Sequence, residues 1–442
     1  MMLNLRYIFR LIGAFFSRFK VLILLGIGLG VLFFFLLKFL IPSLDFVKTV
    51  RIGETGKFTV STLPTPILKS IGNGLTKIDT DGSVIPDLAS SWETTDKGKT
   101  WIFTLKDNIS WQDGSKVTSK TINYQFSDVT IDRPDDKTII FKLQNTYSAF
   151  PSVVSKPTFK SGLLGTGEWK VNKITLNGSA VEKIDLSSKT KGKIVYKFYP
   201  TEESTKAAFE LGQVDQIDDL FSVSPFDTWP KVKINSISDT GEYVAVFFNT
   251  QDPTLQEKNL RQALSYAIDK GALGGVRAIS PISMDSWAYN PQVKPYDYDP
   301  IKAKQMITDY KTAAKLTEIN VNLSAPPLLL DKAETISENW RAVGINVNLQ
   351  VVSTIPSDYQ TFLAILDIPE DPDQYSLWHS TQESTNITRY QNVRIDKLLE
   401  DGRSEIDIES RKKIYLDFQR FLIEDSPAAF LYYPTTYSVS RN

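Results

Sequence analysis

The fold is decided by residues 74–126, which read GLTKIDTDGSVIPDLASSWETTDKGKTWIFTLKDNISWQDGSKVTSKTINYQF. Residues 100–106 of this stretch alternate between apolar and polar side chains, with Trp101, Phe103 and Leu105 on one face. A period of two predicts a strand that buries one face. The stretch shows no pattern typical of a catalytic nucleophile or a metal site, so we expect it to build structure.

The same stretch continues with a turn and a predicted helix. Asp113-Gly114 is a turn signal, and Thr118 is placed to cap a helix that carries Ile122, Tyr124 and Phe126. The capping box is incomplete, because no acid stands three residues after the cap.

Strand and helix signals alternate through the rest of the chain after residue 48. Further strands are predicted at residues 137–143, 193–199, 318–324, 345–352 and 361–366. Helices are predicted at residues 202–211, 259–271, 299–307, 331–343 and 411–425. Strands that alternate with helices favour α/β lobes over a β-sandwich or a helical bundle.

The composition excludes several classes of function. The chain has 442 residues and a net charge of -1, so its charge does not indicate a nucleic-acid partner. It has no cysteine, which excludes disulfides and thiolate chemistry. Its single histidine, His379, argues against histidine triads and multi-histidine metal sites. We therefore predict no metal site and no cofactor.

The first 42 residues differ from the rest. Residues 1–20 carry basic side chains and no acid, and residues 21–42 are apolar apart from Lys38. This length fits one transmembrane helix, and the basic residues before it predict a cytoplasmic N-terminus and an extracytoplasmic folded part. The alternative is a cleaved signal peptide, which the length of the apolar run and the lack of a small-residue cleavage site argue against. A lipid anchor on cysteine is excluded.

The chain resembles the family 5 solute-binding proteins of ABC importers, the dipeptide- and oligopeptide-binding group. Residues 74–126 carry the densest match, and further motifs follow in the order typical of the family. They are GTGEWKV (165–171), EYVAVFFNT (242–250), SWAYNPQVKPYDYDPIKAKQMI (286–307), DPDQYSLWHS (371–380), RYQNVRIDKLLEDGRSEID (389–407) and DSPAAFLYYPTTYSV (425–439).

The resemblance implies an α/β fold of the type II periplasmic-binding-protein kind, a two-lobed clamshell that follows one transmembrane helix. The chain passes quickly from residue 126 to the next strand, so the extra subdomain of the family is expected to be reduced. Lobe I is expected to comprise residues 48–66, 163–246 and 425–442, with residues 67–162 as its subdomain. Residues 247–424 are expected to form lobe II.

One acid is the first candidate for ligand binding. Asp367 directly follows the apolar run 361–366, and in α/β folds ligands gather at the carboxyl ends of strands. The resemblance implies that an aspartate in this segment binds the amine of a peptide. The alternative is that Asp367 only starts a turn, and Asp371 replaces it if the loop DIPEDPD, one residue longer than usual, is aligned differently.

Five more residues are ligand-binding candidates. Trp287 and Tyr289 offer aromatic contact area, although both also fit ordinary packing beneath the loop. Asn249 either donates to a ligand or caps a turn. Gly74 and Leu75 either bring the backbone close to a ligand or form a simple turn.

Together these features predict a membrane-anchored, extracytoplasmic protein that captures peptides or similar small solutes. Its predicted partner is an ABC permease, and no nucleic acid is expected. A membrane-tethered sensing receptor of the same fold is the main alternative. A cell-surface hydrolase is the weakest, because the Ser-x-x-Lys pairs Ser188/Lys191 and Ser410/Lys413 lie in polar, surface-like segments. The chain is therefore not expected to be an enzyme.

Overall fold

The computed structural model describes residues 5–43 and 49–441 of the chain. The chain divides into two compact units, of which the smaller contains α1 and the larger contains residues 50–189 and 194–442. Helix α1 (Leu5–Ser43) includes the apolar segment Gly13–Leu36, none of which is buried. The predicted N-terminal apolar helix is therefore present, and it is long enough to cross a membrane.

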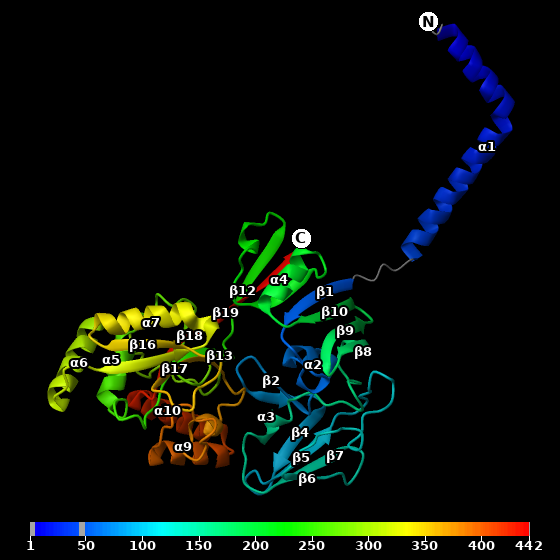
Figure 1. Cartoon of the computed structure of the whole chain (residues 1–442). Helices are drawn as coiled ribbons and strands as arrows, with labels where there is room; N and C mark the ends of the chain where they lie inside the picture. Colours follow the sequence, from blue (N-terminus) through cyan, green and yellow to red (C-terminus); the bar gives the residue numbers. More distant parts are fainter. Residues whose placement is uncertain (1–4, 44–48, 442) are drawn as a thin grey trace. The chain divides into compact units, whose positions relative to one another are not determined.

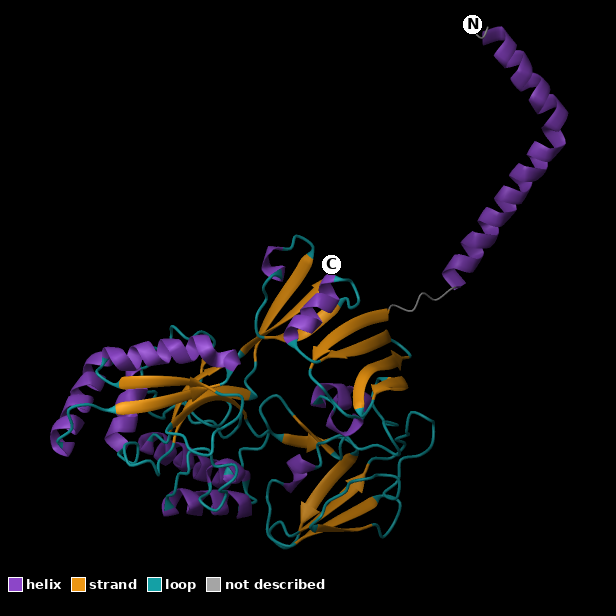
Figure 2. Ribbon diagram, viewed as in Figure 1, coloured by secondary structure: helices purple, strands orange, loops and turns teal. Residues whose placement is uncertain are grey.

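A seven-stranded sheet with helices α2 and α4 forms what we call the first lobe (Figures 1 and 2). Across the sheet the order is β12 (Val232–Ser238), β19 (Thr435–Arg441), β11 (Gln216–Leu220), β1 (Thr49–Thr55), β10 (Gly192–Tyr199), β9 (Ala180–Ser188) and β8 (Lys170–Asn177). The helical segments are η1 (Val60–Thr62), α2 (Thr65–Ile71), α4 (Glu202–Glu210) and η2 (Phe226–Thr228). Helix α4 is capped by Thr201, whose hydroxyl accepts from the Ser204 backbone, and it buries Phe209 against the sheet.

Residues 76–153 form a small-sheet subdomain. Its elements are the hairpin β2 (Thr76–Ile78) and β3 (Val84–Pro86), the sheet β4 (Ala89–Thr94), β5 (Thr100–Leu105), β7 (Thr138–Leu143) and β6 (Val129–Asp132), and the short helix α3 (Phe150–Val153). The alternating residues Trp101, Phe103 and Leu105 are all buried in its core, which confirms the predicted strand.

The helix predicted after Thr118 is wrong. Only a turn forms there, with the Thr121 amide donating to the Thr118 carbonyl, and the chain then runs without regular structure to residue 126. The Arg133 guanidinium binds the carbonyls of Ser119 (2.7 Å) and Ile122 (3.1 Å), which a helix would have used internally. The apolar residues at 122, 124 and 126 also repeat every second position, which is a strand-like period and not a helical one.

A six-stranded sheet with helices α5 to α10 forms the second lobe. The strand order is β14 (Val276–Arg277), β18 (Ala428–Tyr433), β13 (Glu242–Phe248), β17 (Thr361–Asp367), β15 (Asn320–Ala325) and β16 (Asn346–Val351). The helices are α5 (Lys258–Ala267), α6 (Pro300–Ala314), η3 (Pro327–Leu329), α7 (Leu330–Ala342), α8 (Tyr375–Trp378), α9 (Val393–Ser404) and α10 (Ile408–Asp425). The predicted β-α-β unit is present, because β15 and β16 pair in parallel and α7 connects them.

Polar side chains fix the helices of the second lobe. Asp299 caps α6 by accepting from the Lys302 amide at 2.9 Å, as the Asp-Pro start at residue 299 predicts. Arg261 of α5 is almost fully buried and donates to four backbone carbonyls, two of which, those of Asp425 and Ser426, close the end of α10. Each of these bonds satisfies a carbonyl that a helix end or a turn leaves free.

Two chain segments cross together from the seven-stranded to the six-stranded sheet. Strand β12 pairs with β19 from Val232–Arg441 to Ser238–Thr435, and β13 pairs with β18 immediately beyond. At the crossing, the Asp239 amide donates to the Pro434 carbonyl at 2.8 Å. The sheets therefore change at residues 239–241 and at Pro434, whereas the predicted lobe boundaries were 246/247 and 424/425.

A partly buried carboxyl lies on the first lobe's sheet. Because Gly53 of β1 is opposite Ile217 of β11 in parallel register, Glu54 and Asp218 are neighbours on the sheet. Burial, followed by the charges of Asp218 and Asp219, raises the pKa of Glu54 to about 8. This carboxyl therefore favours its neutral form at pH 7.

We expect Glu54→Gln to raise the free energy of unfolding by about 2 kcal/mol at pH 9 and to change it little at pH 5. The folded-state pKa is above the ordinary value of 4.5, so ionisation of Glu54 lowers stability as the pH rises from about 4.5 to about 8. Denaturant unfolding followed by circular dichroism at both pH values measures the effect. Glu182→Gln, at an exposed position on β9, is the control, and equal shifts at both pH values would contradict the prediction.

Candidate functional site

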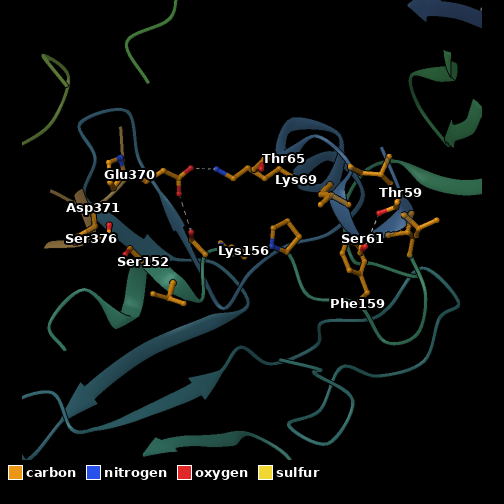
Figure 3. Close-up of a pocket in the computed structure, with 18 of the residues that line it drawn as sticks. Thr59, Ser61, Thr65, Lys69, Ser152, Lys156, Phe159, Glu370, Asp371 and Ser376 are labelled. Carbon is orange, nitrogen blue, oxygen red and sulfur yellow. Dashed lines mark hydrogen bonds and ion pairs between the residues drawn. The ribbon is translucent and has the colours of Figure 1, made fainter. Parts of the chain in front are cut away.

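A cleft of about 1300 Å³ is lined by residues of the first lobe, the small-sheet subdomain and the second lobe (Figure 3). The first two supply residues near η1 and α2, including Thr59, Ser61 and Lys69, and residues of the segment 147–163. The second lobe supplies the loop that follows β17, with Glu370 and Asp371, together with Arg403 of α9. A volume of this size is above the range of roughly 300–1,000 Å³ that is usual for small-ligand sites.

The loop after β17 is held in place by buried ion pairs. Both oxygens of Asp371 bind the Arg411 guanidinium, at 2.8 and 2.5 Å, and Asp371 also accepts from the Asp373 amide. Burial has the largest single effect and disfavours the charged guanidinium, but the charges and hydrogen bonds of Asp371 and Tyr415 together outweigh it, so the pKa of Arg411 lies above its usual value. Asp373 binds Arg403 at 2.9 Å. These two acids are therefore neutralised by arginines of their own lobe.

Glu370 differs from these two acids, because its partners come from the other side of the cleft. Its Oε1 lies 2.6 Å from Lys69 Nζ of α2, and its Oε2 accepts from Ser155 at 3.5 Å (Figure 3). The Lys69 and Glu370 side chains are 43% and 49% exposed, so water reaches this ion pair. A cationic ligand group could therefore compete with Lys69 for Glu370.

A second set of contacts joins the subdomain to the second lobe at the rim of the cleft. The Ser148 amide donates to the Arg403 carbonyl at 2.7 Å, and its hydroxyl donates to the Gly402 carbonyl at 3.1 Å. The Arg403 guanidinium lies 5.0 Å from the Tyr147 ring centroid and 4.2 Å from that of Tyr375. Burial, together with the nearby Asp373 and Asp371, raises the pKa of Tyr147.

The two acids selected from the sequence have different positions. Asp371 lines the cleft, but its oxygens are occupied by Arg411. Asp367 is not among the residues that line the cleft; it ends β17 opposite Glu242 of β13. Burial, then the charge of Asp239, then a hydrogen bond with Asp367 raise the pKa of Glu242 to about 7. The predicted ammonium partner is thus hydrogen-bonded to another acid.

The two aromatic candidates are separated. Trp287 lines a smaller cavity of about 510 Å³, which Asp371 and Arg411 also line. Tyr289 is half-buried next to Arg277 and lines neither this cavity nor the main cleft.

The other three candidates make structural contacts. Asn249 is buried, donates to the Tyr359 carbonyl at 2.9 Å and accepts from the Gln251 amide. Gly74 packs against the backbone of Ser155, where an added Cβ would lie 2.5 Å from the carbonyl oxygen, so only glycine fits. Leu75 is fully buried in the core of the subdomain.

Four residues that line the cleft are not predicted from the sequence: Lys69, Tyr147, Arg403 and Glu370. Glu370 lies in the loop DIPEDPD beside the candidate Asp371, and this position among the loop's acids is the one sequence signal for it. Lys69, Tyr147 and Arg403 lie in three distant segments. Arg403 belongs to the motif at residues 389–407, but nothing in that motif marks it as a site residue. Only the tertiary structure brings them together at the cleft.

The model of the middle region of bacterial extracellular solute-binding proteins, family 5, matches residues 83–386, more than half of the chain. The oligopeptide-binding protein AppA of Bacillus subtilis is 24% identical over 82% of this chain and 80% of its own length. The probable D,D-dipeptide-binding periplasmic protein DdpA of Escherichia coli is 23% identical over 81% of this chain and 82% of its own length.

Solved structures show the same fold. The crystal structure of NikZ from Campylobacter jejuni with Ni(L-His) matches with a TM-score of 0.71 and 22% identity, covering 89% of this chain and 94% of that one. The structure of Bacillus subtilis AppA with a nonapeptide matches with a TM-score of 0.66 and 20% identity, over 89% and 94%. The structural matches confirm the predicted α/β two-lobed fold. The relatives are solute-binding proteins, which confirms the prediction that the chain is not an enzyme. The chain belongs to family 5 of the bacterial extracellular solute-binding proteins.

Proposed function

We propose that this chain is a membrane-tethered solute-binding protein that holds a peptide or similar small solute in the main cleft and delivers it to an ABC permease. The observation that carries the proposal is the cleft of about 1300 Å³, because both lobes contribute to its lining. A ligand held there contacts both lobes at once and therefore favours their closed arrangement. Two of the relatives described above are named as peptide-binding proteins, which supports peptides as the first ligand class to test.

Glu370 is the acid proposed to bind the amine of such a ligand. Asp371 and Asp373 are each paired with an arginine of their own lobe, whereas Glu370 is bound by Lys69 across the cleft. A primary amine resembles the Lys69 ammonium in charge and in hydrogen-bond donors, so it can take its place. Asp367, the candidate from the sequence, remains the alternative, and substitutions distinguish the two.

We expect Glu370→Gln to weaken the binding of a free-amine peptide at least tenfold, because a hydrogen bond to a charged group contributes about 1.5–3 kcal/mol. The full chain in detergent is first incubated with a tripeptide pool, and native mass spectrometry identifies the retained peptide. Calorimetry then compares that peptide with its N-acetylated form, for which Glu370→Gln should have little effect.

Asp367→Asn and Glu383→Gln are tested in the same way. Glu383 is exposed in the loop after α8, so its substitution is the control for lost charge. We expect both to change affinity less than twofold. A larger loss in Asp367→Asn than in Glu370→Gln would identify Asp367 as the amine partner. The absence of any retained peptide would count against peptides as the ligand class.

The tether proposal rests on α1, whose apolar segment Gly13–Leu36 is long enough to span a bilayer. A signal sequence meets the same criterion, so the length of the mature protein distinguishes an anchor from a cleaved signal. We expect an intact mass of 49.8 kDa and retention in the membrane fraction after alkaline carbonate washing. Deleting residues 1–42 should release the protein into the soluble fraction. A mature chain that begins near residue 42 would show that the segment is a cleaved signal.

A further inference from the structure

The cavity of about 510 Å³ that Trp287 lines shares two lining residues with the main cleft, Asp371 and Ser152. We call it the second chamber. Trp92 of β4 and Trp101 of β5 come from the small-sheet subdomain, whereas Trp287, Ile406 and Ile408 come from the second lobe. Its volume is within the range of small-ligand sites, and the two shared residues place it beside the cleft.

The walls of the second chamber leave apolar surface uncovered. The Ile406 and Ile408 side chains are 39% and 50% exposed, and Trp92 and Trp287 are only partly buried. Each Å² of apolar surface that a ligand removes from water contributes roughly 25 cal/mol. The chamber therefore favours an apolar group over a polar one.

Contacts within the protein hold the walls of the second chamber in place. The Trp287 amide donates to the Asp81 carbonyl at 2.8 Å, which connects the second lobe to the subdomain at this wall. The Trp287 ring lies edge-on to Tyr415 with a centroid distance of 6.4 Å. The Arg411 guanidinium is 5.7 Å from the Trp287 ring centroid, and Asp371 neutralises its charge. Because these side chains are already held in place, binding costs little side-chain entropy, which favours affinity.

We propose that the second chamber is a subsite for one aromatic side chain of the peptide held in the cleft. The inference rests on the proposed function and adds a ligand preference to it. Trp92 and Trp287, the two partly exposed tryptophans in the walls, favour a ring over an aliphatic group, because aromatic pairs in edge-on or offset geometry gain attraction beyond their buried area.

Tripeptides test the subsite with the full chain in detergent. Calorimetry compares Ala-Ala-Ala with peptides that carry phenylalanine at the first, second or third position, and with the cyclohexylalanine peptide of the best position. We expect phenylalanine at one position to bind at least tenfold more tightly than alanine. Cyclohexylalanine has about the bulk of phenylalanine but lacks the aromatic π electrons, so we expect the cyclohexylalanine peptide to bind more weakly than the phenylalanine peptide.

Substitutions in the chamber should remove this preference. We expect the double variant Ile406→Ser/Ile408→Ser, and separately Trp287→Ala, to reduce the phenylalanine-to-alanine affinity ratio below threefold. Because both isoleucines are exposed, we expect the double variant to fold even if Trp287→Ala does not fold. The matched control is Ile301→Ser/Val393→Ser, at positions 84% and 86% exposed on α6 and α9, which should keep the full ratio.

The possible results separate the two proposals. If Ala-Ala-Ala binds but phenylalanine gives no gain at any position, or if the ratio survives in Ile406→Ser/Ile408→Ser, the subsite is overturned and the proposed function stands. Equal affinities for cyclohexylalanine and phenylalanine would overturn the aromatic assignment. If no tripeptide binds, peptides are overturned as the ligand class of the proposed function, and the subsite is overturned with them.

Discussion

The arrangement of the two lobes depends on the pair of chain segments that cross between the two large sheets. The 2.8 Å bond from the Asp239 amide to the Pro434 carbonyl lies where β12 and β19 give way to β13 and β18. Pro434 has no amide hydrogen, so the ladder cannot continue through it unchanged. Ladders of backbone hydrogen bonds join the strands within each sheet, and these ladders change partners at the crossing. Relative motion of the lobes is therefore expected to concentrate at the crossing.

Regular alternation made many elements predictable. The buried face of β5 and the parallel pair β15 and β16 follow from periods of two, and the start of α6 follows from an Asp-Pro cap. The helix predicted after Thr118 is wrong because the apolar period there is two and because Arg133 takes the carbonyls. Local pattern thus identified elements well wherever no distant side chain competed for the backbone.

The candidate site was much less predictable. The loop DIPEDPD was recognised, but which of its acids remains available to a ligand depends on where the arginines lie. Arg403 and Arg411 lie on α9 and α10, some thirty to forty positions further along the chain, and each neutralises one acid. Glu370 remains, and its partner Lys69 is 301 positions away. No local pattern encodes such pairings, because they arise only when both lobes and the subdomain have folded.

The Ser148 contacts at the rim of the cleft also bear on kinetics. Two hydrogen bonds join this residue to Gly402 and Arg403 of the other lobe, and they must break before the lobes can separate there. At about 1 kcal/mol each, such bonds slow opening by roughly fivefold apiece. Both bonds are made between atoms of the protein alone. The residence time of a captured solute is therefore set partly by contacts that the solute does not make. For two solutes of equal affinity for the cleft walls, these contacts slow release by the same factor.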